Sequence, residues 1–218
     1  MKGKAKLLTW IVLGLLALSL AACAGGIGGG DAQAHLDAGK RLSDEKRYEE
    51  AAKELEQAVK LDPKLAEAHF RLGNAYAELG RPADAEKSYK QALALKPDDA
   101  DVLSNLGVVY YHQSRFEDAV QQFQAALKLK PNDADIHYNL GGVYLQQGKF
   151  DQALAEFDKA KALKPDLAEI YLGYGFTYKE LGRTQEAIAA LEKFLELSSD
   201  PQWRAQAEAT LKELRGAP

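Results

Sequence analysis

The sequence predicts an all-α fold, a superhelical solenoid of about five helix pairs followed by one C-terminal capping helix. Three observations support this: a helix–turn–helix pattern recurs five times, small residues recur every 34 residues, and closing prolines recur at the same step. A fixed period of roughly 20 to 50 residues is the signature of helical repeat proteins. The small-residue series are Gly39, Gly73, Gly107, Gly141 and Gly175, and Ala51, Ala85, Ala119, Ala153 and Ala187. The closing prolines are Pro63, Pro97, Pro131 and Pro165.

The composition is that of a soluble domain with room for a sizeable core. The chain has 218 residues, of which 46% are hydrophobic and 28% are charged. Its net charge of −4 gives no basic face, so we expect no nucleic acid partner. The single cysteine excludes an internal disulfide, and no Cys/His cluster suggests structural zinc. We therefore expect no metal and no cofactor.

The N-terminal residues have the layout of a secretory signal. Three lysines, at positions 2, 4 and 6, precede an apolar stretch over residues 7–20, and small residues follow it. The ending Leu-Ala-Ala-Cys at residues 20–23 resembles the bacterial lipobox. This resemblance implies a lipoprotein signal peptide at residues 1–22, with cleavage before Cys23 and acylation of that cysteine.

Two other interpretations of this segment stay open. One is an uncleaved membrane anchor, although the apolar part is short of the roughly 20 residues that a spanning helix needs. The other is ordinary secretion, with cleavage at an A-x-A site formed by residues 22–24. Under the lipoprotein interpretation, residues 23–31 form a Gly-rich linker. Ala24 after the cysteine then favours the periplasmic face of an outer membrane, since an Asp there would resemble a retention signal for the inner membrane.

The repeats follow the linker in order. We place them at residues 32–65, 66–99, 100–133, 134–167 and 168–201, with the capping helix and tail at 202–218. The first helix of the first repeat is weak, and terminal repeats are often atypical. In the last repeat, Phe194 stands where the earlier copies have alanine. We expect it to fill space against the capping helix, whose apolar stripe is Trp203, Ala207, Leu211 and Leu214.

The residues that carry the period resemble the tetratricopeptide repeat family over residues 32–201. The third repeat has the whole motif: Leu106, Gly107, Tyr110, Ala119, Phe123, Ala126 and Pro131. Gly107 and Ala119 are small where two antiparallel helices approach closely, and Phe123 fills the space between them. We therefore expect Gly141→Leu to cost about 1–3 kcal/mol by overpacking.

The resemblance implies a concave groove, lined by the first helices of successive pairs, that binds a protein or peptide segment. Asn105 and Asn139 resemble the asparagine ladder with which some family members hold a peptide backbone, since an amide both donates and accepts hydrogen bonds. The neighbouring positions along the groove are occupied by apolar or aromatic residues, which would form a surface for a partner protein. These residues are Phe70, Tyr111, Tyr138, Leu145, Leu172 and Phe176, with Val108 beside them. The alternatives are an ordinary surface role for the asparagines and packing against neighbouring helices for several of the apolar residues.

Other recurrent polar residues have plainer explanations. Some members of the family bind a terminal carboxylate with a clamp of lysine and asparagine residues. The lysine positions of such a clamp are occupied here by Leu36, Ser104 and Tyr138, so we do not expect binding of a terminal carboxylate. Acidic residues recur near the starts of first helices, where they either complement helix dipoles or form an acidic rim. They are Glu67, Asp101, Asp135 and Glu169. His35, His69 and His137 fall in different copies about 10 Å apart and are interpreted as packing residues.

No nucleophile elbow, phosphate loop or HExxH motif occurs in the sequence, so we expect no enzyme activity and no small-molecule substrate. The leading hypothesis is a lipid-anchored envelope scaffold that binds a protein segment in its groove. It resembles bacterial outer-membrane lipoproteins that assist type IV pilus assembly, or that hold cell-wall hydrolases to partners. A pilotin-like lipoprotein, a self-associating structural adaptor and, less favoured, an enzyme subunit remain as alternatives.

Overall fold

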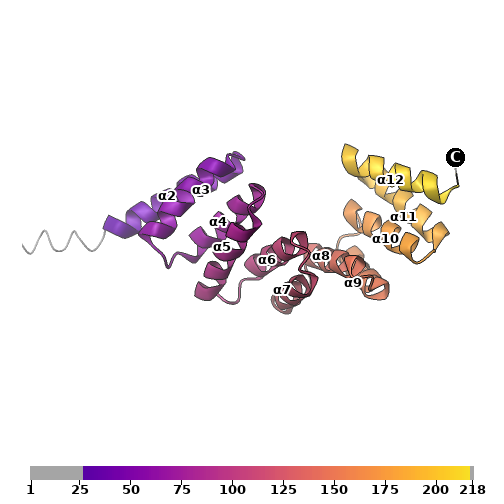
Figure 1. Ribbon diagram of the computed structural model, residues 1–218, viewed down its shortest axis with the longest axis horizontal. Helices are drawn as coiled ribbons and strands as arrows, with labels where there is room; N and C mark the ends of the chain where they lie inside the picture. The colour runs from indigo at the N-terminus through magenta and orange to yellow at the C-terminus, as the bar shows by residue number, and fades with distance from the viewer. Residues whose placement is uncertain (1–26, 217–218) are drawn as a thin grey trace, which may run out of the picture. The chain divides into compact units, whose positions relative to one another are not determined.

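The computed structural model describes residues 27–216, and within them the chain is all helix with no strand (Figure 1). Five antiparallel helix pairs are followed by one further helix, which confirms the predicted fold class. The first four helices are α2 (Ile27–Asp44), α3 (Tyr48–Leu61), α4 (Ala66–Glu78) and α5 (Pro82–Leu95). The next four are α6 (Ala100–His112), α7 (Phe116–Leu129), α8 (Ala134–Gln146) and α9 (Phe150–Leu163). The last three are α10 (Ala168–Glu180), α11 (Thr184–Leu197) and α12 (Pro201–Leu214).

The described residues form two compact units, one up to Lys96 and one from Pro97 onward. In the first unit, α2 packs on α3, α3 on α4 and α4 on α5. In the second unit, each helix from α6 to α12 packs on the next, and the first helices α6, α8 and α10 also contact their neighbours in that series. The candidate site lies within the second unit.

Each pair turns through one residue in the left-handed backbone region. Gly80, Gly148 and Gly182 take this place with φ of 66°, 70° and 69°, and Lys46 and Ser114 take it with φ of 58° and 59°. The following N–H closes the first helix, as Arg81 does by donating to the carbonyl of Tyr76 at 2.9 Å. Glycine suits three of the five turns because it has no side chain to collide with the backbone there.

The glycine series marks where a ring or a leucine from the second helix presses on the first. A Cβ placed on Gly141 would stand 2.6 Å from Cε1 of Phe157, and one on Gly107 would stand 2.9 Å from Cε1 of Phe123. Ala119 on the facing helix is completely buried. The small residues thus allow the close helix approach expected from the sequence, and the aromatic rings fill the seam.

The capping helix α12 covers the end of the second unit. Leu172, Leu191, Phe194, Ala207 and Leu211 form one buried cluster there, with Leu214 packed against it. The expected role of Phe194 is therefore confirmed. The place given to Trp203 on the apolar stripe is wrong: this residue lies in the first turn of α12, and its side chain is 45% exposed.

The start of the first helix also differs from expectation. Residues 27–31 of the expected Gly-rich linker belong to α2, while residues 23–26, with Cys23, lie outside the described residues. Ala32 and Leu36 are buried against the rest of the unit, and a helix anchored in this way extends by further residues at low cost. Between residues 27 and 216, no helix is long and apolar enough to cross a membrane.

Candidate functional site

The candidate site is the face that α6, α8 and α10 present within the second unit. We call it the inner face and define it by Tyr111, Tyr138, Asn139, Gly142, Leu145 and Phe176. All six are half-buried, so each is supported by packing yet keeps part of its surface open. A Cβ added to Gly142 would meet no atom within 4 Å, so the centre of this face has free space above it.

An open cavity of about 520 Å³ lies at one end of the inner face. Leu145 at the end of α8 and Phe176 on α10 line it, and Phe150, the first residue of α9, adds a second aromatic ring. Lys179 also lines it and forms an ion pair with Glu213 of the capping helix at 2.7 Å. Its lining is mixed: Leu145, Phe150 and Phe176 form an apolar side, and the remaining side chains are polar or charged. The cavity can therefore take an apolar side chain of a bound segment on one side and polar groups on the other.

The two tyrosines of the inner face are held by neighbouring rings. The Tyr111 ring lies 6.0 Å from that of Phe116, and the Tyr138 ring lies 6.0 Å from that of Phe157. Burial raises the pKa of Tyr138 to about 12, and the nearby charge of Glu169 adds to this. Burial also raises the pKa of the Tyr111 phenol. Both groups therefore stay neutral near pH 7 and can serve a partner as apolar surface and hydrogen-bonding hydroxyls.

The asparagine series is short. Asn105 on α6 and Asn139 on α8 are both half-buried, and Asn105 already interacts with another part of the protein. The equivalent position on α10 is Gly173, where a Cβ would stand only 2.6 Å from Cζ of Phe157. An asparagine at this position would require the Phe157 ring to shift, whereas Phe123 accommodates Asn139 at the equivalent positions one repeat earlier.

Two of the expected groove residues lie apart from the inner face. Phe70 belongs to the first unit, where its ring lies 6.2 Å from that of Tyr89 and is half-buried on α4. Leu172 was expected in the groove, and this is wrong: it is 5% exposed in the cluster beneath α12. The last repeat packs against the capping helix, so the residue at this position is buried in the core.

The sequence did not identify every residue around the cavity. Gln206 and Thr210 of α12 line it together with Gly148 of the turn before α9 and Phe150 at the start of α9. The sequence marked α12 as a cap for the core, but its polar face gave no sign of a second role as a wall of the cavity.

The recurrent polar residues have structural roles. His137 is buried, with Nδ1 2.6 Å from a Glu156 carboxylate oxygen and Nε2 2.9 Å from the carbonyl of Pro131. It is thus a packing residue, as expected. No group of three or more acidic, histidine or cysteine side chains in the described part of the chain could hold a metal ion. The first-turn acids include Asp135, which pairs with Lys164 at 2.7 Å.

Family and structure comparisons agree with this architecture. Tetratricopeptide repeat families match residues 72–134, 104–168 and 140–212, and a TPR repeat family matches residues 39–80. Together these matches span residues 39–212. Comparison with curated proteins finds no match.

Several solved structures are similar over most of their length. A MamA protein is 28% identical with a TM-score of 0.69, covering 77% of this chain and 92% of its own. PilF of Pseudomonas aeruginosa is 25% identical with a TM-score of 0.70, covering 88% and 95%. YrrB, described as a TPR protein with an unusual peptide-binding site, is 23% identical with a TM-score of 0.69, covering 87% and 97%, and this likeness shows the fold alone.

The repeat matches, the helix pairs with their glycine–ring contacts and the structural likenesses lead to one conclusion. The fold is typical of protein-interaction scaffolds without enzymatic activity. The chain belongs to the tetratricopeptide repeat family.

Proposed function

We propose that the protein is a membrane-anchored scaffold that binds a segment of another protein on its inner face and so assists assembly of an envelope complex. The observation that carries this proposal is the open cavity of about 520 Å³ between Leu145, Phe150 and Phe176. It continues a face of half-buried aromatic residues. Apolar surface that stays partly open beside a cavity is the usual mark of a partner site.

The chemistry of the inner face favours an apolar or aromatic segment. Tyr111 and Tyr138 offer flat rings with neutral hydroxyls, and Gly142 leaves room for a backbone to approach closely. Asn139 offers one amide to a peptide backbone. Lys179 and Glu180 place one charge of each sign beside the cavity, so the site has no strong preference for a charged ligand.

The membrane anchor is the second part of the proposal and rests on the sequence alone. The basic start, the apolar stretch and the Leu-Ala-Ala-Cys ending support acylation at Cys23. One acyl chain holds a protein only marginally, whereas two or more hold it firmly. We propose the periplasmic face of the outer membrane as the location, because Ala24 follows the cysteine.

Photo-cross-linking in cells tests the inner face. Photoreactive groups at Asn139 and Phe176 should capture a partner protein, because both positions face the proposed segment. Lys128, which is exposed on the second helix of its pair, is the matched control. Equal labelling at all three positions would argue against the inner face as the binding site.

Metabolic fatty-acid labelling tests the anchor independently. Cys23→Ser should abolish incorporation of the label and leave an unprocessed precursor. Continued labelling of this variant would rule out acylation at Cys23, while the cross-linking result would still stand on its own.

Two alternatives use the same surfaces. A pilotin-like lipoprotein of pilus biogenesis would share the anchor and the groove, and the identity of the cross-linked partner separates it from a general scaffold. A self-associating structural adaptor would be larger than 23.9 kDa in light scattering, with the mass rising as the concentration rises. An enzyme subunit is the least favoured of the candidates.

A further inference from the structure

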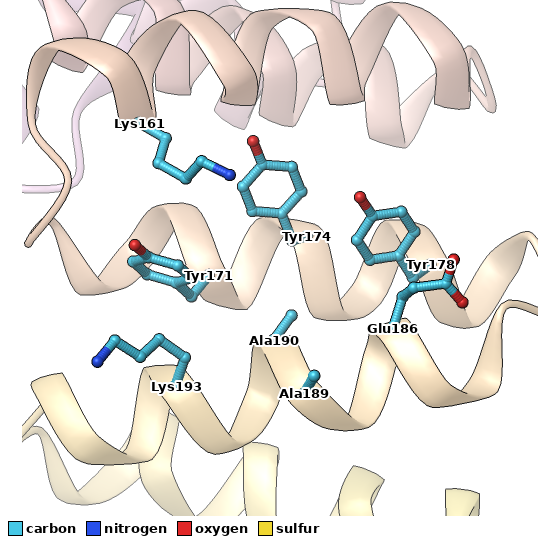
Figure 2. Close-up of a pocket in the computed structure, with 8 residues that line it drawn as sticks. All are labelled: Lys161, Tyr171, Tyr174, Tyr178, Glu186, Ala189, Ala190 and Lys193. Carbon is cyan, nitrogen blue, oxygen red and sulfur yellow. The ribbon is translucent and has the colours of Figure 1, made fainter.

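A second, smaller cavity lies on another face of α10. It has a volume of about 290 Å³ and is lined by side chains of α9, α10 and α11 (Figure 2). We call it the tyrosine pocket and define it by Lys161, Tyr171, Tyr174, Tyr178, Ala190 and Lys193. The tyrosines follow one another along α10 at i, i+3 and i+7, and Leu145 and Phe176 of the inner face do not line it.

The rings of the tyrosine pocket are fixed in place. Tyr174 and Tyr178 are stacked, with centroids 5.7 Å apart and planes 10° from parallel, and Tyr171 lies 6.4 Å from Tyr174. The Tyr171 hydroxyl donates to the carbonyl of Pro165 at 2.7 Å, and the Tyr174 hydroxyl donates to Asp158. The pocket therefore has preformed aromatic walls, which lowers the entropy cost of binding.

The tyrosine pocket exists because the last repeat departs from the others. In the fourth repeat, His137 and Glu156 bond to each other at 2.6 Å and fill the space between the two helices of the pair. The equivalent residues in the fifth repeat are Tyr171 and Ala190. Because the alanine side chain is much shorter than that of Glu156, the space between the two helices stays open there. Tyr174 replaces the leucine found at its position in the three preceding repeats, Leu72, Leu106 and Leu140.

Two further residues shape the rim. Ala189 and its equivalent in the fourth repeat, Ala155, are short where the first three repeats have long polar side chains, namely Lys53, Lys87 and Gln121. Lys161, near the end of α9, stands where those three repeats have apolar residues, namely Val59, Leu93 and Leu127. Lys161 is exposed, and its ammonium lies beside the Tyr174 ring.

We propose that the tyrosine pocket is a second docking site, separate from the inner face, which takes one aromatic side chain carried by an acidic protein segment. The volume suits a single large side chain, since it lies just below the range of about 300–1,000 Å³ that is usual for small-molecule sites. The half-buried rings of Tyr171 and Tyr178 form its open aromatic surface, and Tyr174, only 4% exposed, lies between them. These rings favour an aromatic occupant, because offset and edge-to-face ring contacts add to the burial of apolar surface.

Charge around the pocket favours an acidic segment. The Lys161 ammonium lies 5.1 Å from the Tyr174 ring centre and forms no ion pair with any described residue. Lys193 lies on the other side of Tyr171, and its only carboxylate partner among residues 27–216 is the exposed Glu196 (Figure 2). Glu186, the acid that lines the pocket, is paired with Arg183 at 2.7 Å. A carboxylate beside the bound ring would thus meet two lysines.

An amide NMR titration of the full-length chain in mild detergent tests this proposal. The probe is the peptide acetyl-Glu-Asp-Phe-Asp-Glu-amide, and two control peptides carry alanine in place of phenylalanine or glutamine and asparagine in place of the acids. We expect shifts at Tyr171, Tyr178 and Ala190, and little change with either control peptide. Binding should weaken as salt is raised, because the lysines are exposed.

Two variants copied from the chain's own third repeat should weaken binding without disturbing the fold. Ala189→Gln narrows the rim, as Gln121 does, and Lys161→Leu removes the unpaired charge, as Leu127 does. Each should raise the Kd about tenfold, a loss typical of a residue that contributes directly to binding. Lys128→Leu removes an exposed lysine elsewhere and should leave the Kd within about twofold. Thermal melts of all three should match that of the parent chain.

Each contrary result overturns the tyrosine pocket in a distinct way. Shifts at Leu145 and Phe176 that survive Ala189→Gln would place the peptide on the inner face and leave the proposed function standing. Equal binding of the peptide with alanine in place of phenylalanine would show that charge attraction alone causes the binding and that the pocket takes no aromatic side chain. Concentration-dependent shifts at the pocket without peptide would identify a second copy of the chain as the occupant. Absence of any shift at millimolar peptide would exclude the pocket as a site for this ligand class.

Discussion

Gly141 and Gly142 are neighbours in α8 but have opposite surroundings. A Cβ on Gly141 would stand 2.6 Å from Cε1 of the fully buried Phe157, whereas a Cβ on Gly142 would meet nothing within 4 Å. The periodic series contains Gly141, and Gly142 falls outside it. At the scale of single residues, the sequence period therefore identifies the glycine that packing requires.

These two glycines offer a matched pair of substitutions. Gly141→Ala should destabilise the protein by about 1–3 kcal/mol, and Gly141→Leu by at least as much, because the fully buried Phe157 ring would have to shift. Gly142→Ala should be neutral or stabilising by up to about 1 kcal/mol, since alanine is the better helix former. Thermal or urea unfolding measures both. Equal effects at the two positions would contradict the glycine–ring contact.

Tyr138 predicts a loss of stability at high pH. Its pKa is raised by burial from 10.0 to about 12, so the folded chain holds this proton over a range in which the unfolded chain has lost it. Its contribution to the free energy of unfolding is therefore fully present below pH 10 and is lost as the pH rises through the folded-state pKa of about 12. Tyr138→Phe should flatten the fall in unfolding free energy over this window. Some slope should remain, because burial raises the pKa of Tyr76 to about 12 as well.

Individual helices differ in how their first turns are capped. The Asp133 side chain accepts hydrogen bonds from the N–H groups of Asp135 and Ile136, at 3.1 and 3.2 Å, at the start of α8. The equivalent residue before α10 is Leu167, which has no such bond. Helix α10 therefore depends more on packing than α8 does.

Removal of the α8 cap should be measurable. Asp133→Ala should cost about 1 kcal/mol, since two N–H groups of the first turn lose their acceptor. The exposed neighbour Asn132 provides the control, because Asn132→Ala removes a polar side chain of similar size that caps nothing. Chemical denaturation of the two variants gives the comparison, and no difference between them would refute the capping role.

Most elements could be predicted from the period because each helix repeats the same contacts. The start of α2 and the exposure of Trp203 on α12 could not be predicted, since each of these helices has a packed neighbour on one side only among the residues that the structure describes. Trp203 shows this: its spacing fits the apolar stripe, yet Ala207 and Leu211 already fill the space next to Phe194. The helical period places a residue on the apolar side of a helix, but it does not show how far along the helix the surface that covers this side extends.

The candidate site could be predicted in part for the same reason. The side chains of Tyr138, Leu145 and Phe176 stay partly exposed because each lies on the first helix of a pair and has a similar neighbouring helix. Leu172 has an equivalent position in the sequence but lies beneath α12. Whether these residues bind a partner stays a prediction, since the repeat period carries information about stacking and not about ligands.

For the molecule as a whole, the capping helix should control solubility. Terminal repeats of a solenoid need a polar outer face, and α12 buries Leu172, Leu191 and Phe194. Leu211→Asp should place a charge in this cluster, lower the melting temperature and cause association that light scattering detects. Lys212→Asp changes an exposed neighbour and should leave the protein monodisperse. Aggregation of both variants alike would show that surface charge, and not the cap, is responsible.

The Phe157 ring lies against two glycines, Gly141 of its own pair and Gly173 of the next. In a chimera with a copy of the fourth repeat in place of the fifth, Asn139 would come to the position of Gly173, and the Phe157 ring would have to shift. Phe123 and Asn139 already stand in this relation one repeat earlier, so the ring would need a new position but no smaller side chain. A designer who lengthens the array would therefore keep the fourth and fifth repeats together and insert new modules before them.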